Sequence, residues 1–137
     1  MKRRLWAIFT VVAGLELSIL SAADGPRTVS GDEARLLVLQ ALPSKTRQLP
    51  KFGLDQYQDP HFPQFYFFEA TWAGVPNGSS VIGHYAVDSS TGDVWNAIQC
   101  EKEDTRALRK LQERIRLQIG LSDSEYQKMK RQGPACS

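Results

Sequence analysis

Residues 65–98, FYFFEATWAGVPNGSSVIGHYAVDSSTGDVWNAI, predict an antiparallel meander of three strands. The strands are expected over residues 65–72, 81–88 and 94–98. Turns are predicted at Asn77-Gly78 and at Thr91-Gly92, because Gly, and less readily Asn, accepts a positive φ. The rest of the chain is expected to supply helices that cover this sheet.

A symmetric first turn fixes the strand register, which pairs Tyr66 with Val87, Phe68 with Tyr85, Ala70 with Gly83, and Trp72 with Val81. Side chains alternate between the faces of a sheet, so these residues share one face. That face is almost wholly apolar and is predicted to be the core face, with Val94 and Ile98 added by the third strand. The other face, the mixed face, is expected to carry Phe65, Phe67, Glu69, Thr71, Ile82, His84, Ala86, Asp88, Trp95 and Ala97.

The first 23 residues have the composition of a secretory signal. A basic start at Lys2-Arg3-Arg4 precedes an apolar run that is too short to span a bilayer, and small residues end at Ala23. The alternative is an uncleaved membrane anchor. We expect cleavage before Asp24, a mature single domain over residues 24–137, and a periplasmic or secreted location without stable membrane insertion.

Length and composition are those of one soluble globular domain: 137 residues, 42% hydrophobic and 23% charged. The formal charge of +2 comes from the expected signal, and the remaining basic and acidic residues are equal in number. No overall field therefore favours nucleic acid or an anionic membrane as a partner.

Helices are predicted on both sides of the meander. Ser30 and Glu33 form a capping box that opens a helix over residues 29–42. A second helix is expected over 104–119, ended by Gly120, and a second capping box, Ser122 with Glu125, opens a short third helix. The predicted fold class is α+β: an N-terminal helix packed on a three-stranded antiparallel meander, followed by two C-terminal helices. A proline-rich connection, 44–64, has no predicted element.

Cys100 and Cys136 are the two cysteines of the chain. In an exported protein such a pair favours a disulfide, which would tie the C-terminal segment to the edge of the sheet. The alternative is a free reactive thiol, which would need a basic neighbour.

Catalytic and metal-binding patterns are sparse. The register sets Glu69 opposite His84, where the pair would form a general base or an ordinary cross-strand polar contact. Asp55, Asp59 and His61 have spacing that suits a metal, but such residues are also common in proline-rich loops. We expect no catalytic residues, no metal and no cofactor.

The mixed face is the predicted binding face, because an apolar patch of that size rarely stays in water unless something covers it. Its candidate partner-binding residues are Phe65, Phe67, Glu69, Ile82, His84 and Trp95. Three covers are possible: the C-terminal helices or the proline-rich loop, a partner protein, or a second copy of the chain in a homodimer.

The segment from His84 to Trp95, with the pattern Tyr-x-Val-Asp-x-x-Thr-Gly-x-Val, resembles the PepSY family. The likeness covers roughly residues 30–98. It implies a small, cystatin-like α+β module that is exported or displayed at the cell surface and is not a catalyst. Some members are protease-inhibiting parts of propeptides. The cysteine pair, the proline-rich loop and the basic helix after the sheet depart from the family pattern.

Together these observations predict a non-enzymatic periplasmic or secreted module that binds or inhibits another protein. One alternative is a periplasmic immunity protein that neutralises a toxin. Others are an assembly factor of the envelope and a small hydrolase that uses His84 with Glu69.

Overall fold

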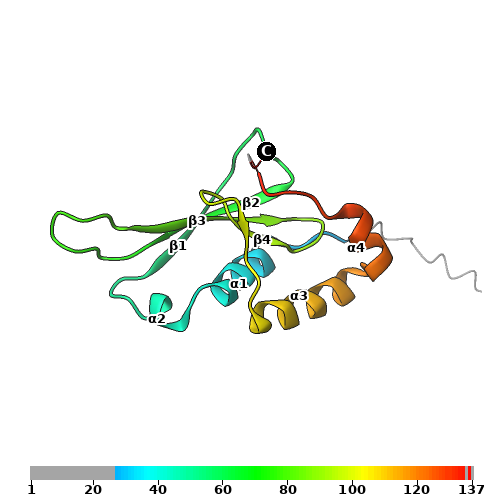
Figure 1. Cartoon of the computed structure of the whole chain (residues 1–137), viewed down its shortest axis with the longest axis horizontal. Helices are drawn as coiled ribbons and strands as arrows, with labels where there is room; N and C mark the ends of the chain where they lie inside the picture. The colour runs from blue at the N-terminus through cyan, green and yellow to red at the C-terminus, as the bar shows by residue number, and fades with distance from the viewer. Residues whose placement is uncertain (1–26, 135, 137) are drawn as a thin grey trace, which may run out of the picture.

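The computed structural model describes residues 27–134 and Cys136; the predicted signal lies outside this range. The elements follow one another as α1 (Gly31–Ala41), α2 (Ser44–Arg47), β1 (Gly53–Tyr57), β2 (Phe65–Thr71), β3 (Val81–Asp88), β4 (Val94–Asn96), β5 (Glu101–Lys102), α3 (Arg106–Ile119) and α4 (Asp123–Met129). The five strands form one antiparallel sheet in chain order. Figure 1 shows α1 and α3 on one side of this sheet, and the β1–β2 connection with the C-terminal segment on the other.

The predicted α+β class and the order of its main elements are confirmed. The sheet is wider than predicted, because β1 forms inside the proline-rich connection and β5 adds two residues at the far edge. β1 fits between Pro50 and Pro60, neither of which lies in its ladder with β2. A proline at either of those positions therefore removes no ladder hydrogen bond.

The helix caps form as predicted. Ser30 and Glu33 exchange both hydrogen bonds of a capping box at α1, and Ser122 and Glu125 do the same at α4. Gly120 ends α3 with a φ of 76°, a left-handed conformation that favours glycine.

The register is confirmed from Tyr66 opposite Val87 to Ala70 opposite Gly83, and Val87 pairs with Val94. Beyond Ala70 a β-bulge leaves Ile82 unpaired and sets Val81 opposite Thr71. The predicted pairing of Trp72 with Val81 is therefore wrong, because the extra residue shifts the register by one. The Trp72 backbone N–H instead donates to the Ser80 carbonyl at 2.9 Å.

The main core lies between the sheet and the two long helices. Its largest fully buried apolar side chains are Val29, Leu37, Val38, Phe68, Val87, Val94 and Leu108. The prediction that Ile98 joins this core is wrong, because β4 ends at Asn96 and Ile98 is 68% exposed. The Asn96 side chain there accepts hydrogen bonds from the backbone of Ile98 and Gln99, which turns the chain away.

Candidate functional site

The sheet face that points away from α1 and α3, called the outer face below, is the predicted mixed face. Part of it is closed by the chain itself. Phe65 and Phe67 are only 3% and 5% exposed, and they pack with Ala86, Phe62 and Trp95. We call these five residues the covered end. Phe65 and Phe67 are therefore buried, which agrees with the predicted alternative of a cover by the proline-rich loop and not with open anchors for a partner.

Two segments form the cover. Phe62, from the β1–β2 connection, places its ring centroid 6.4 Å from that of Phe67. On the other side Gly133 lies flat against Trp95, so close that a Cβ at this position would be 2.8 Å from indole Cδ2. Glycine is therefore needed where the C-terminal segment crosses the tryptophan ring.

Cys100 and Cys136 hold that segment in place. They form the predicted disulfide, with their Cα atoms 5.4 Å apart and 36 positions apart in sequence. The bond ties the C-terminal segment to the sheet near β4 and β5, next to the covered end. Neither cysteine is a free thiol.

Ile82 does not join the other predicted binding residues. It packs against the main core cluster, whereas Phe65, Phe67 and Trp95 form the second cluster. The cause is the bulge beyond Ala70, which changes the side of the sheet on which residues before Gly83 lie.

The remainder of the outer face is open to solvent. Asp55, Glu69 and His84 form one row across β1, β2 and β3, and Tyr57 stands beside them opposite Phe67. We call these four residues, Asp55, Tyr57, Glu69 and His84, the open end. Tyr57 is 40% exposed, and its ring stacks on Phe67 with 5.5 Å between centroids.

The polar contacts within the open end are long. Glu69 Oε2 lies 3.7 Å from His84 Nε2, and the Tyr57 hydroxyl lies 3.5 Å from His84 Nδ1. Both exceed the usual hydrogen-bond range. Burial raises the pKa of Tyr57, and the negative charges of Glu69 and Asp59 raise it further. The predicted Glu69–His84 pair therefore exists as a loose contact in a region of negative potential.

The turn between β3 and β4 is the second polar centre. Asp93 is 1% exposed, and its Oδ1 lies 2.8 Å from both Lys102 Nζ and Arg116 Nη2. The Tyr126 hydroxyl donates to the same carboxylate at 3.1–3.2 Å, and the Arg116 guanidinium stacks 3.9 Å over the Tyr126 ring. Burial lowers the pKa of Lys102, but its hydrogen bonds to Asp93 and Tyr126 outweigh this and raise it overall. One buried carboxylate thus joins β5, α3 and α4.

The same turn receives further contacts from the C-terminal half. Gln112 donates to the Gly92 carbonyl at 2.9 Å, and Arg116 Nε donates to the Thr91 carbonyl at 2.8 Å. Arg131 Nε lies 2.9 Å from Asp88 Oδ2, as an ion pair with little hydrogen-bond directionality. The residues that carry the PepSY resemblance therefore anchor the helices and the C-terminal segment in this chain.

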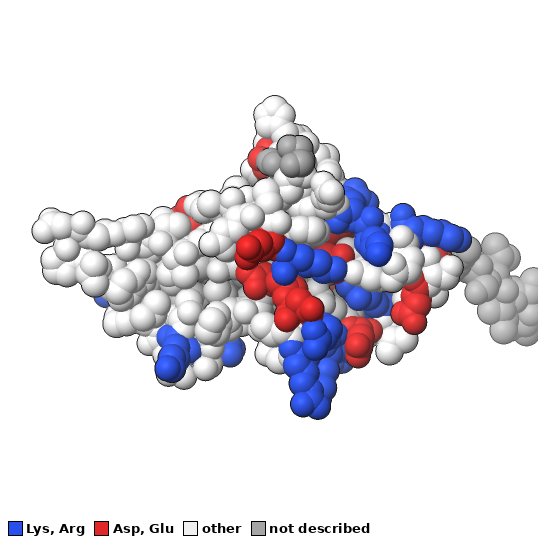
Figure 2. Space-filling view, in the orientation of Figure 1, with Lys and Arg blue, Asp and Glu red and all other residues white. Residues whose placement is uncertain are grey.

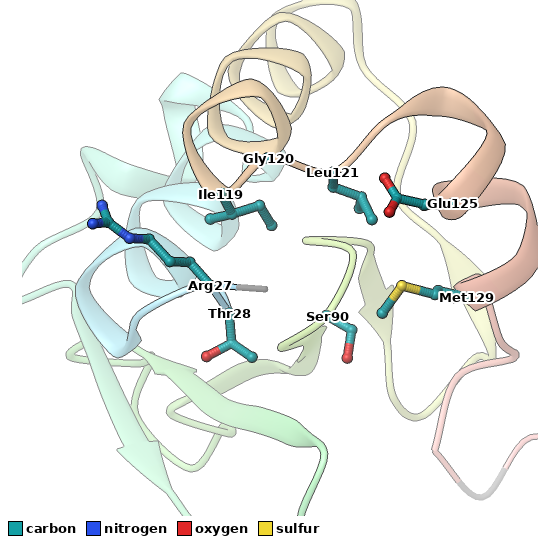
Figure 3. Close-up of a pocket in the computed structure, with 8 residues that line it drawn as sticks. All are labelled: Arg27, Thr28, Ser90, Ile119, Gly120, Leu121, Glu125 and Met129. Carbon is teal, nitrogen blue, oxygen red and sulfur yellow. The ribbon is translucent and has the colours of Figure 1, made fainter. Parts of the chain in front are cut away.

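A cavity of about 270 Å³ lies between Thr28, Ser90, the end of α3 and α4 (Figure 3). Ile119, Leu121 and Met129 surround it with apolar surface. The nearest carboxylate, Glu125, is engaged by Ser122, which lowers its pKa. The cavity therefore offers apolar contact but little polar recognition.

The alternative metal set does not assemble. Asp55 lies in β1, while Asp59 Oδ1 accepts the backbone N–H of His61 at 2.9 Å in the following loop. Within residues 27–134 and Cys136, no three His, Cys, Asp or Glu side chains gather as a metal site. In the same range no helix combines the length and the apolar character that a membrane crossing requires.

The sequence analysis did not identify the roles of Tyr57 and Asp93, although the distribution of charged residues along the chain gave an indication. Residues 52–101 contain no Lys or Arg, but they contain six acidic residues: Asp55, Asp59, Glu69, Asp88, Asp93 and Glu101. In Figure 2 the Lys and Arg side chains gather mainly over α3, α4 and β5, while the end formed by the β2–β3 hairpin shows almost no charge. Residues 52–101 therefore supply acidic groups without basic ones, and the basic partners of Asp88 and Asp93 come from Lys102 and the residues after it.

Comparisons with known proteins give one informative likeness. No protein-family model matches the chain, and no curated protein matches it. Its fold is similar to a chain in the structure of a type VI secretion system effector–immunity complex from Pseudomonas protegens. The two chains are 26% identical with a TM-score of 0.60, and the likeness covers 74% of this chain and 85% of the other. The PepSY resemblance stays a prediction.

Proposed function

We propose that this chain is an exported immunity-type protein that binds a toxic effector protein and neutralises it outside the cytoplasm. The observation that carries the proposal is the likeness to a chain of an effector–immunity complex, which extends over 85% of that chain. The Cys100–Cys136 disulfide supports a location in an oxidising compartment such as the periplasm.

The immunity role is favoured over the effector role by the chemistry of the open end. A general base needs a partner within about 2.6–3.2 Å of the proton that it moves. The 3.7 Å contact between Glu69 and His84 is longer and half-exposed, and the Tyr57 hydroxyl lies equally far from the ring. We therefore propose binding in preference to the alternative of a small hydrolase that uses His84 with Glu69.

The test starts by identifying the partner. The mature chain is cross-linked in periplasmic extract of cells that encode it, and the captured protein is then produced in a sensitive host with a signal peptide of its own. We expect the captured protein to lower colony survival, and this chain to restore survival at least 100-fold when it carries residues 1–23.

Deletion of residues 2–23 is the control for location, because it removes nothing from the described domain and keeps the chain in the cytoplasm. Protection should disappear in that variant. The cytoplasm also keeps Cys100 and Cys136 reduced, so Cys136→Ser with residues 1–23 retained separates the effect of location from that of the disulfide. A captured protein that is harmless in the periplasm, or protection that is independent of the signal, would count against the proposal. Hydrolysis of a substrate by the purified chain that is lost in His84→Ala would favour the hydrolase.

A further inference from the structure

We propose that the open end of the outer sheet face is the docking surface for a cationic region of the effector; this inference rests on the proposed function. The occupant is a protein surface that presents Lys or Arg side chains around an apolar or aromatic contact. The argument comes from charge, strand register and exposed apolar surface.

The first step is the uneven pairing of the acidic residues of the sheet. Asp88 and Asp93 are buried and paired with cations from later in the chain: Arg131, Lys102 and Arg116. At the open end Asp55 and Glu69 have no ion pair with a Lys or Arg among residues 27–134 and Cys136. Their own strands contain no basic residue that could supply one.

The second step is an unfavourable contact that the register imposes. Asp55 lies directly opposite Glu69, so two carboxylates occupy one cross-strand position on the same face. Like charges in that arrangement destabilise a sheet. The raised pKa of Tyr57 comes first from burial, and the negative charges of Glu69 and Asp59 add to it. A cation from a partner would relieve this repulsion, which gives the free protein a built-in preference for a basic ligand.

The third step is the apolar surface beside these charges. Tyr57 is held against Phe67 and still exposes 40% of its surface, so it offers a rigid aromatic contact. Val81, opposite the end of β2, is 38% exposed. Tyrosine is enriched at protein interfaces because it gives a large contact area and a hydroxyl at little entropic cost.

The sign of the charge selects the occupant. A symmetric dimer through this face would place the same carboxylates of two copies against each other. Nucleic acid and anionic lipid would meet the same repulsion. A basic protein surface satisfies the carboxylates and buries the aromatic contact together.

The first arm of the test needs no effector. A synthetic peptide of alternating lysine and serine, and a control peptide with glutamate in place of lysine, are titrated into isotope-labelled mature protein. We expect amide shifts in β1, β2 and β3 with the lysine peptide alone. The double variant Asp55→Asn/Glu69→Gln should weaken that binding at least tenfold, while Glu101→Gln/Glu113→Gln, which removes the same charge from exposed positions elsewhere, should change it less than twofold.

The second arm measures association with the captured effector at low and high salt. Charges at an interface act mainly on the association rate, and salt screens them. Asp55→Asn/Glu69→Gln should slow association at least tenfold at low salt, and the difference should shrink at high salt. Circular dichroism melts of both double variants check that the fold is kept.

The outcomes separate this inference from the proposed function. Equal association of the two double variants with the effector, or lysine-peptide shifts that are absent or fall on α3 instead, would overturn the docking surface. Neutralisation would then still stand. If no toxic effector is found but the lysine peptide maps to the open end and loses affinity in Asp55→Asn/Glu69→Gln, the surface is supported and the immunity role falls.

Discussion

The two ends of the outer sheet face share β2 and β3 and differ in what surrounds them. The covered end extends to β4, and the open end extends to β1. At the covered end, aromatic rings are closed over by Phe62 and by Gly133. At the open end, the side chains are exposed or half-exposed, and the two carboxylates have no Lys or Arg partner among the described residues; Glu69 has only the loose contact with His84. The difference shows that the chain covers the apolar part of this face, while the charged part stays partly open to solvent.

The largest expected effect is a difference in stability loss between a substitution at the covered end and one at the open end. Phe67→Ala removes a nearly fully buried ring and should lower the free energy of unfolding by about 3–5 kcal/mol. Tyr57→Ala, on the same cross-strand pair, should cost about 1 kcal/mol, because the ring is already 40% exposed. Urea unfolding of both variants gives the comparison, and equal losses would mean that the covered end is not closed in solution.

Loss of the disulfide should expose the covered end to solvent, as the open end is. In the entropic model, a bond that closes a loop of 36 residues contributes up to about 4 kcal/mol. Cys136→Ser should lower stability by roughly that amount and shift Trp95 fluorescence towards the emission of a hydrated indole. The fluorescence of Trp72, in the β2–β3 hairpin, is the control. The variant Cys136→Ser/Trp95→Phe keeps Trp72 but not Trp95, and its emission should not shift if the rest of the fold is unchanged. A Cys136→Ser protein with unaltered stability would show that the C-terminal segment is held by packing alone.

Asp93→Asn tests the ion pairs that join the β3–β4 turn to β5 and α3. The substitution keeps the shape of the side chain but leaves Lys102 and Arg116 without their shared counter-charge. Breaking a fully buried pair costs about 3–5 kcal/mol. Lys102 and Arg116 are partly exposed, so we expect about 2 kcal/mol in chemical denaturation. Glu113→Gln on α3 is the control and should change stability by less than about 0.5 kcal/mol.

Asp88→Asn should have the smallest effect, and one that depends on pH. Burial raises the pKa of Asp88 above its ordinary value of 3.8, although the Ser90 N–H and Arg131 oppose this and Asp93 adds to it. Folding therefore favours the protonated carboxyl. The wild-type protein should gain stability relative to Asp88→Asn as pH falls from neutral through the raised pKa, with no further gain below 3.8.

At neutral pH the two proteins should differ by less than about 1 kcal/mol, because the lost pair with Arg131 is partly exposed. Unfolding measured at several pH values gives the difference directly. A wild-type protein that loses stability relative to the variant on acidification would show that the Arg131 pair, and not burial, governs Asp88.

The sequence predicted the features that depend on residues close to one another in the chain. The Asn77-Gly78 turn and the alternation of apolar residues gave the register of β2 and β3, and the capping boxes gave the starts of α1 and α4. The bulge beyond Ala70 left no local mark, so Ile82 was assigned to the wrong side. β1 was missed because prolines flank it and its support comes from pairing with β2 across the loop of residues 58–64, which has no hairpin-turn pattern.

The candidate site was predicted in part. Glu69 and His84 were placed together because cross-strand neighbours follow from register alone. Which end of the outer face is covered depends on Phe62 and on the C-terminal segment. Phe62 lies only five residues before Phe67, but its contact depends on the path of the β1–β2 loop, whereas Arg131 and Gly133 are far in sequence from Asp88 and Trp95. Tyr57 entered the site only once β1 was known.

The position of the cover has a consequence for the order of folding. Ribosomes make the aromatic strands before they make Gly133 and Cys136, so Phe65 and Phe67 are complete while half of their cover is still unsynthesised. A folding intermediate in which the C-terminal segment has not yet packed would expose the apolar strip that Phe65 and Phe67 form, and exposed strips of that kind promote aggregation. In the folded protein the C-terminal segment covers this strip, and the Cys100–Cys136 disulfide holds that segment in place.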